Sequence, residues 1–233
     1  MDQLSHSEKI SVAILDDHQS IIDGYLFRLS QTPEIEVVGT VAYGAELEPM
    51  LSEHSVDVLI LDIQVPTSSV NPNPYPILHL IPRLLQKNPN LNVLVISFHK
   101  QAAIIKSVME MGASGYILKE DYATIQALGD VVCAIARGNI YFSQQAFQLL
   151  AKKIPEDSLL TARQLEVLSL CAAFPDATTA ELANRIGIAN STLRNLLSGA
   201  YIRLNVRNRT SAIAKARQLG IITPPPPSFE FQK

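Results

Sequence analysis

The hydrophobic pattern divides this chain into an alternating front part and a helical back part. In residues 10–140, short runs rich in Val and Ile alternate with longer stretches whose apolar residues recur at helical spacing. Such short apolar runs are typical of strands that are buried on both faces of a parallel sheet. The pattern predicts five strands, at Val12–Leu15, Ile35–Ala42, Val56–Leu61, Val93–Ile96 and Gly115–Leu118.

Helical stretches separate these runs. They are Ser20–Gln31, Ala45–Glu53, Ile77–Gln86, Gln101–Met111 and Tyr122–Arg137. Strands that alternate with helices predict right-handed crossovers and a parallel sheet that is covered on both faces. The front part is therefore expected to be a three-layer α/β domain with a five-stranded, doubly wound parallel sheet.

After Phe142 the pattern predicts helices only. A linking helix is expected over Ser143–Lys153 and a joint over Pro155–Ser158. Four short helices should follow, with Thr161 as an N-cap and Gly187 as a C-cap. Their ranges are Thr161–Ala173, Thr178–Ile186, Ser191–Leu204 and Arg209–Leu219. The final residues include four consecutive prolines, which favours an extended tail.

Charge is distributed unevenly along the 233 residues, whose net charge is −3. Residues 1–154 hold 10 Lys and Arg against 16 Asp and Glu, a net charge of −6. Residues 155–233 hold 9 against 6, a net charge of +3. This asymmetry is typical of a regulator joined to a polyanion binder. We expect an α/β domain at 8–138, a linker at 139–157, an all-α domain at 158–222 and a tail at 223–233.

The location of the protein is indicated by three further features. Cys133 and Cys171 lack CxxC spacing and are expected to be reduced core residues. No run reaches the ~18 apolar residues of a membrane span. Residues 1–9 are polar and lack the apolar core of a signal peptide. We therefore expect a cytoplasmic protein without a membrane partner.

Chemically active side chains follow the predicted strands. Asp16 and Asp17, Asp62, Ser97 and Lys119 each come at the end of one strand. The carboxyl ends of parallel strands share one edge of the sheet, where ligands bind. Converging carboxylates repel one another unless a cation intervenes, and Mg²⁺ prefers such oxygen ligands. The set predicts a site at which a carboxylate accepts a phosphoryl group, with the Lys amine and Ser hydroxyl contacting that group.

Three segments then resemble the signatures of bacterial response-regulator receiver domains, whose fold is flavodoxin-like. These segments are Ala13–His18, Leu59–Pro66 and Gly112–Lys119, and the resemblance covers roughly residues 10–137. It implies Asp62 as the phosphoacceptor, Asp17 as a direct Mg²⁺ ligand, Asp16 as a ligand through water and the Gln64 carbonyl as a further ligand. It also implies Ser97 as the switch hydroxyl and Tyr116 as the switch aromatic residue.

One segment of this domain departs from the receiver pattern. The loop Thr67–Pro76 is longer than is usual in receivers and carries Pro72, Pro74 and Pro76. Because it borders the phosphorylation site, it could alter access or dephosphorylation, although drift explains it equally well. His18 is expected to be structural or exposed to solvent, since Mg²⁺ prefers oxygen.

The back part has the pattern of a helix-turn-helix. A short helix, a turn at Gly187–Asn190 and a second helix capped by Ser191 follow in order. Seven cations and no acid lie between Arg185 and Arg217, a distribution that favours binding to nucleic acid. We expect base contacts from the exposed face of the second helix and phosphate contacts from the flanking residues. The predicted DNA-contacting residues are Ser191, Thr192, Arg194, Asn195, Ser198, Arg203, Arg207, Arg209 and Thr210.

This part closely resembles the LuxR/NarL/FixJ type of helix-turn-helix over about residues 158–222. The resemblance rests on Thr161–Leu168, the helix-turn-helix and the run Arg207–Thr210. Leu196 and Gly199 depart from the pattern of the second helix, and Gly199 costs about 1 kcal/mol of helix stability relative to Ala. The loop Phe174–Thr178 is about two residues longer than usual.

Together the two parts predict a two-component transcriptional regulator. A sensor histidine kinase would phosphorylate Asp62, and a homodimer would bind double-stranded DNA. Two alternatives stay open: a regulator whose basic domain docks a protein partner, and a DNA binder that ignores phosphorylation. A phosphatase of the aspartate-nucleophile type wants an acid two residues after the nucleophile, and Gln64 stands there. We therefore expect a protein that is not an enzyme.

Overall fold

The computed structural model describes residues 9–151, 160–219 and 221–222. The first described part alternates strands and helices as expected. Its elements are β1 (Ile10–Leu15), α1 (Gln19–Leu29), β2 (Ile35–Val41), α2 (Gly44–Glu53), β3 (Val58–Leu61), β4 (Pro66–Ser68), β5 (Asn71–Pro74), α3 (Ile77–Lys87), β6 (Asn92–Ser97), α4 (Ala102–Glu110), β7 (Gly115–Leu118), α5 (Tyr122–Gln126), α6 (Leu128–Ala136), β8 (Tyr141–Phe142) and α7 (Gln144–Ala151). The predicted helix Tyr122–Arg137 is thus divided at Ala127 into α5 and α6.

The main sheet has the strand order β2-β1-β3-β6-β7-β8, and every pairing in it is parallel. The doubly wound parallel fold is therefore confirmed, but the prediction of five strands is wrong by one. The sixth strand, β8, is only two residues long, and backbone hydrogen bonds from Tyr141 to Ser114 and from Ser143 to Tyr116 attach it to β7. A two-residue strand leaves no detectable period in a sequence.

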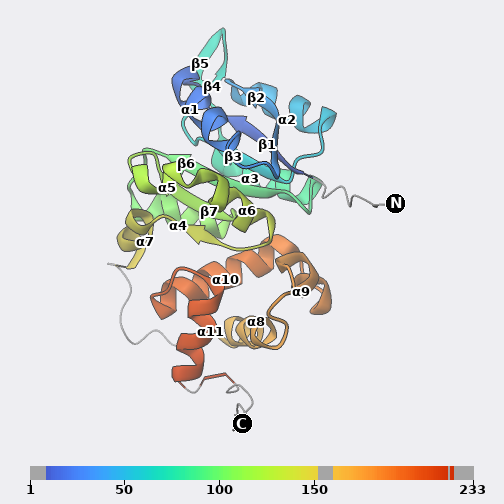
Figure 1. Ribbon diagram of the computed structural model, residues 1–233, viewed down its shortest axis with the longest axis vertical. Helices are drawn as coiled ribbons and strands as arrows, with labels where there is room; N and C mark the ends of the chain where they lie inside the picture. Colours follow the sequence, from blue (N-terminus) through green and yellow to red (C-terminus); the bar gives the residue numbers. More distant parts are fainter. Residues whose placement is uncertain (1–8, 152–159, 220, 223–233) are drawn as a thin grey trace, which may run out of the picture.

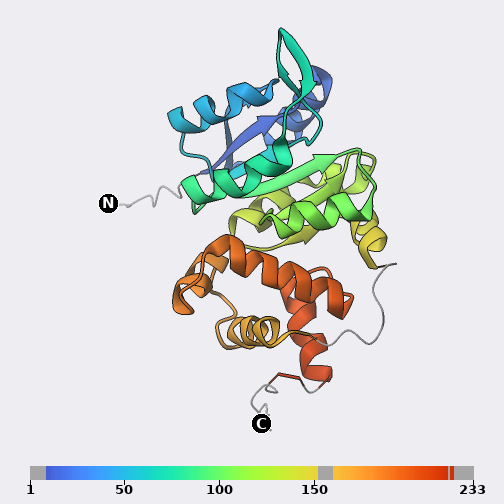
Figure 2. The same cartoon turned by 180° about the vertical axis from the view of Figure 1, so that it is seen from behind.

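Two helical layers cover this sheet (Figures 1 and 2). The apolar residues of α1 and α6 pack against one face, where Ile14, Ile60 and Ile96 point. Residues from α2, α3, α4 and α7 pack against the other face. Alternate residues of each strand point to opposite faces, so β1, β3 and β6 are buried on both sides and read as continuous apolar runs.

A second, small sheet occupies the segment that the sequence predicts as a loop. β4 and β5 pair in an antiparallel hairpin between Pro66 and Pro74. Its polar, proline-rich sequence lacks the alternation of a half-buried strand, which explains why periodicity does not reveal it.

The back part folds into the predicted helices α8 (Ala162–Ala173), α9 (Thr179–Arg185), α10 (Asn190–Leu204) and α11 (Arg209–Gln218). Thr161 caps α8 as expected, because its Oγ1 accepts from Gln164 N while Gln164 Oε1 accepts from Thr161 N. Gly187 has φ +65°, in agreement with its predicted role after α9. α10 starts at Asn190, one residue before the predicted Ser191 cap, and has no side-chain cap.

The packing of α10 on α8 gives Gly199 a structural reason. A Cβ at Gly199 would lie 2.6 Å from Gln164 Nε2, on the side chain that closes the capping box of α8. Glycine therefore permits the close approach of the two helices, and this packing offsets its lower helix propensity.

Several predicted segments lie wholly or partly outside the described residues. They are the joint Pro155–Ser158, the end of the linking helix and the tail 223–233. The predicted domain boundaries consequently stay predictions. Within the described ranges, no helix has the length and apolarity that crossing a membrane requires.

Candidate functional site

Three buried charged side chains meet at the carboxyl edge of the main sheet. Asp16 follows β1, Asp62 follows β3 and Lys119 follows β7. The strand order β1-β3-β6-β7 brings these ends together. Lys119 Nζ lies 2.6 Å from Asp16 Oδ2 and 2.7 Å from Asp62 Oδ2. The sequence-predicted carboxylates and amine thus form one cluster, although more than a hundred residues separate the first from the last.

Burial sets the electrostatics of this cluster. Asp16 is 1% exposed, Asp62 4% and Lys119 8%. Burial raises the pKa of Asp16 above its ordinary value, while the ammonium of Lys119 opposes that shift. The ring of Phe98 lies 5.2 Å from Lys119 Nζ and covers the amine from one side. Two ionised carboxylates beside one ammonium leave a net negative charge, which attracts a further cation.

Asp17 and His18 lie beside the cluster, nearer to solvent. His18 Nδ1 lies 2.8 Å from Asp17 Oδ1 and 3.5 Å from Asp16 Oδ1. The possible ligand atoms of these three residues lie within 4.8 Å of one another. The His18 side chain is 57% exposed, as expected. The carboxylates of Asp16 and Asp17 offer the oxygen donors that Mg²⁺ prefers, and Asp62 is joined to Asp16 through Lys119, whereas the imidazole does not suit the ion.

Gln64 occupies the rim of the same site. Its backbone N–H donates to Asp62 Oδ1 at 3.2 Å, which holds the loop after β3 close to that carboxylate. Its side chain is exposed to solvent. The structure therefore places Gln64 next to Asp62, on the side where the β4–β5 hairpin begins.

Ser97 and Tyr116 both contact the backbone of His99, in the loop between β6 and α4. His99 N donates to Ser97 Oγ at 3.5 Å, and Tyr116 Oη donates to the His99 carbonyl oxygen at 2.8 Å. Tyr116 is fully buried, and burial raises the pKa of its phenol. The two predicted switch residues are thus joined through one residue, His99, in the loop that leads to α4.

The second helix of the helix-turn-helix, α10, lies against the α/β domain (Figure 1). The guanidinium of Arg194 enters that domain near the amino ends of β6 and β7. Its Nη1 donates to Ser114 Oγ and, at 3.2 Å, to Asn92 Oδ1. Both terminal nitrogens lie 3.2 Å from the carbonyl oxygen of Leu91. Arg194, predicted to point outward for base contacts, is only 1% exposed here.

No described carboxylate forms an ion pair with Arg194. Burial lowers the pKa of its guanidinium to about 10, and its Nε has no hydrogen-bond partner among the described residues. Neutral acceptors offset only part of the cost of removing a charge from water. Burial of Arg194 therefore costs free energy in the closed arrangement, in which α10 packs against the α/β domain.

Further contacts surround this arginine. Asn195 Nδ2 donates to the carbonyl oxygen of Glu110, at the end of α4. Two glycines with positive φ allow close approach: a Cβ at Gly112 would lie 2.9 Å from Ser191 Cβ, and one at Gly138 would lie 2.8 Å from Thr179 N. The α/β domain thus contacts α10 and the start of α9 over a continuous surface.

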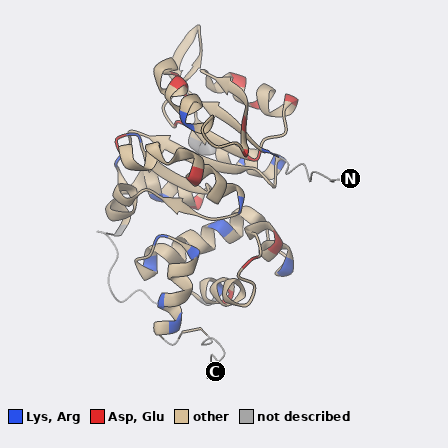
Figure 3. Cartoon of the chain, viewed as in Figure 1, with Lys and Arg blue, Asp and Glu red and all other residues tan. Residues whose placement is uncertain are grey.

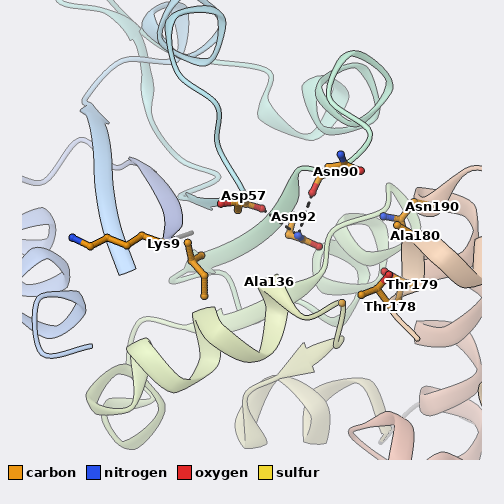
Figure 4. A pocket seen from close by; sticks show the side chains of 11 residues that line it. Lys9, Asp57, Asn90, Asn92, Ala136, Thr178, Thr179, Ala180 and Asn190 are labelled. Carbon is orange, nitrogen blue, oxygen red and sulfur yellow. Dashed lines mark hydrogen bonds between the residues drawn. The ribbon is translucent and has the colours of Figure 1, made fainter. Parts of the chain in front are cut away.

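A polar pocket of about 400 Å³ opens beside this contact (Figure 4). Asp57 and Asn92 contribute from the α/β domain, and Thr178, Thr179 and Asn190 from the helical domain. Asn92 Nδ2 donates to the carbonyl oxygens of Asp57 and Asn90, so the pocket side of Asn92 is already engaged. The pocket lies between the two domains.

The other predicted DNA contacts fall into two groups. Thr192, Arg203, Arg207 and Thr210 are exposed, and basic residues are spread along α10 and α11 (Figure 3). Ser198 is buried, and its Oγ donates to the Asn195 carbonyl oxygen. Arg209 donates to the carbonyl oxygens of Ala177 and Phe174 at 2.6 Å, so its guanidinium holds the loop before α9. These two residues have structural partners that the sequence does not indicate.

The sequence did not predict the residues that accept hydrogen bonds from Arg194. Asn92 begins a strand whose next four residues are apolar, and Ser114 precedes another strand. Ser114 Oγ also donates to Asn92 Oδ1 at 3.2 Å, which orients that oxygen. A polar residue at the start of a buried strand is a weak signal, since it is usually explained by the end of the strand.

Comparisons with known proteins agree with both parts. The family model described as "Response regulator receiver domain" matches residues 12–128. The model described as "Bacterial regulatory proteins, luxR family" matches residues 158–216.

Curated relatives cover nearly the whole chain. The transcriptional regulatory protein DegU of Brevibacillus brevis is 28% identical over 94% of this chain and 98% of its own length. The probable transcriptional regulatory protein NarL of Mycobacterium tuberculosis is 28% identical over 90% of this chain and 94% of its own length. RcsB of Salmonella enterica serovar Typhimurium, solved with promoter P1flhDC and the phosphomimetic BeF3⁻, is 23% identical with a TM-score of 0.55. That likeness covers 91% of this chain and the whole of RcsB, and it shows a shared fold.

Proposed function

Because the chain belongs to the response regulators that join a receiver domain to a LuxR-family DNA-binding domain, we propose that phosphorylation of Asp62 controls its binding to DNA. A sensor histidine kinase supplies the phosphoryl group in the cytoplasm, and the DNA-binding domain regulates transcription. The observation that carries this proposal is the contact of Lys119 with both Asp16 and Asp62 at one end of a sheet whose other end holds Arg194.

In the phosphoryl transfer, Asp62 is the nucleophile. One of its carboxylate oxygens attacks phosphorus, the bond from phosphorus to the donor histidine nitrogen breaks, and that nitrogen keeps the electron pair. Lys119 leaves its double contact with the carboxylates and neutralises charge on the transferred group. Asp17 and the Gln64 backbone carbonyl would hold Mg²⁺, with Asp16 contributing through water, and the bound ion would neutralise further charge on the phosphoryl group.

The switch follows from the new charge. A phosphoryl group adds about −2 charge and three acceptor oxygens. Ser97 Oγ turns to donate to one of these oxygens and gives up its contact with His99 N. Because Tyr116 holds the carbonyl of the same His99 residue, both changes act on the start of α4. Through α4, the phosphoryl group biases the position of α10.

The receiver holds α10 at the edge of the sheet opposite the phosphoryl site. Ser97 ends β6 and Asn92 begins it, so about 17 Å of strand separates the two contacts at ~3.3 Å per residue. DNA cannot reach Arg194 while the receiver binds this side chain. The covered α10 supports regulated binding over binding that ignores phosphorylation.

On DNA, the released α10 enters the major groove. Arg194 and Asn195 contact base edges, and a guanidinium pairs best with guanine. Ser191, Thr192, Arg203, Arg207 and Thr210 contact phosphates or flank the bases. Arg209 and Ser198 support the domain that presents them. The active protein is a homodimer on paired half-sites, with centres ~34 Å apart when they are one helical turn apart.

The test is a titration of labelled promoter DNA with the wild-type protein and Asp62→Ala, with and without Mg²⁺ and acetyl phosphate, at two salt concentrations. Tighter, salt-sensitive binding by the treated wild type alone supports the proposal. Binding that ignores both the donor and the mutation would leave a DNA-binding protein without a phosphoryl switch. Absence of binding in every state would instead favour a regulator that docks a protein partner.

A further inference from the structure

The β4–β5 hairpin starts beside the predicted phosphoryl site, and its far end projects from the receiver (Figure 1). It begins at Pro66, four residues after Asp62, and its base continues from Gln64 at the rim of the site. Residues 63–76 contain no Lys, Arg, Asp or Glu. The hairpin is therefore an uncharged projection next to a highly charged site.

Several contacts fix this projection in place. Thr67 Oγ1 donates to the Asn73 carbonyl oxygen at 2.8 Å across the hairpin. Tyr75 N donates to the Val65 carbonyl oxygen at 2.9 Å and closes the base of the hairpin. The Tyr75 ring occupies the space where a Cβ of Gly44 would lie, within 2.1 Å, which joins the base to α2. A segment anchored at its base and across its strands is a built surface feature rather than a slack loop.

The composition of the hairpin indicates how it is recognised. Pro66, Pro72 and Pro74 lack backbone N–H donors, so the hairpin is poorly suited to pairing with a further strand. A partner would contact its side chains instead of its backbone, and Val70 at its tip is 91% exposed. An uncharged hairpin with one apolar tip fits a neutral partner surface that has a shallow apolar depression.

The position of the hairpin decides which partner approaches it. Asp62 is 4% exposed, and a donor phosphorus must come within about 3.5 Å of its oxygen for transfer. A small phosphodonor such as acetyl phosphate has little surface to place against the hairpin. A protein donor brings a whole surface to the rim, and the four residues of β5 project up to about 13 Å at ~3.3 Å per residue. A protein that phosphorylates Asp62 therefore brings its surface to the side of the site where the hairpin begins.

We propose that the β4–β5 hairpin is a docking and specificity element for the protein that donates the phosphoryl group, with Val70 as its apolar contact. This inference rests on the proposed role of Asp62. It distinguishes two routes to the same carboxylate. Small phosphodonors phosphorylate Asp62 without binding the hairpin, whereas a histidine kinase binds it.

The experiment compares these two routes. Full-length wild type, Val70→Asp and Leu219→Asp are each treated with ³²P-labelled acetyl phosphate and with a panel of purified, autophosphorylated histidine kinases from the source organism. Val70 is exposed, so its substitution leaves the core intact. Leu219 is a matched control, because it is 54% exposed and lies in the helical domain.

We expect Val70→Asp to lower the rate of transfer from the most active kinase at least tenfold, while the acetyl phosphate rate changes less than twofold for both variants. An unchanged kinase rate, or an equal fall in both rates, would overturn the proposal. So would a change in oligomeric state at an unchanged kinase rate, since the tip would then contact a second copy of the chain. Labelling by acetyl phosphate but by no kinase would reject the docking role and leave Asp62 as phosphoacceptor. Labelling by neither donor would reject both.

Discussion

Removal of the Ser114 hydroxyl should open the protein without phosphorylation. Ser114 Oγ accepts from Arg194 Nη1 and is fully buried at the contact between the two domains. Ser114→Ala deletes one hydrogen bond to a charged donor, which contributes about 1.5–3 kcal/mol. Leu91 and Asn92 still accept from Arg194, so the lower end of that range, about 1.5 kcal/mol, applies.

That energy translates directly into DNA affinity. When only the open fraction binds, the apparent Kd falls in proportion to the increase in that fraction. A shift of about 1.5 kcal/mol corresponds to a roughly tenfold tighter apparent Kd for the unphosphorylated protein. The gain cannot exceed the affinity of the phosphorylated wild type, because full opening is the limit.

The assay is fluorescence anisotropy on a duplex selected from a random pool with acetyl phosphate-treated wild type. Ser52→Ala serves as the control, since it removes a receiver hydroxyl on α2 that donates to the Glu48 carbonyl oxygen. Phosphorylated Ser114→Ala should bind as the phosphorylated wild type does, within about twofold. If the unphosphorylated variant binds no better than the wild type while phosphorylation still tightens wild-type binding, the hydrogen bond from Arg194 to Ser114 does not stabilise the packing of α10 on the receiver.

Three further predictions concern other contacts. Arg194→Met should leave the unphosphorylated protein closed, because it removes a costly buried charge. It should weaken binding of the phosphorylated protein by about 1–3 kcal/mol, measured in the same titration; unchanged binding would exclude a base contact. Arg207→Ala should weaken DNA binding by the same factor on all DNA sequences. The slope of log K against log salt concentration should become about one unit less steep. A loss that depends on the DNA sequence would contradict a phosphate contact. Mg²⁺ at ten times its Kd should stabilise the wild type by about 1.4 kcal/mol in urea unfolding, and Asp17→Asn should lose this gain; equal gains would remove Asp17 from the ligand set.

The hydrophobic pattern was enough to predict the α/β architecture and the cluster of Asp16, Asp62 and Lys119. Buried strands read as Val- and Ile-rich runs because both of their faces are covered, and the residue after each run must lie at the carboxyl edge. Asp16, Asp62 and Lys119 could therefore be placed together before any distance was known. The capping residue Thr161 was likewise predictable, because a cap depends only on residues three positions away.

The contacts of α10 could be seen only in the folded molecule. Helical periodicity separates an apolar stripe from a polar face, but it cannot tell a polar face in solvent from one buried against another domain. Arg194 was predicted to be exposed and is buried, because Leu91, Asn92 and Ser114 provide acceptors that lie 80 to 103 positions away in the sequence. The strand β8 and the β4–β5 hairpin escaped prediction for a similar reason: the first is too short for a period, and the second is defined by backbone pairing rather than burial. Local pattern fixes what each segment forms, whereas long-range contacts fix which surfaces remain available for DNA.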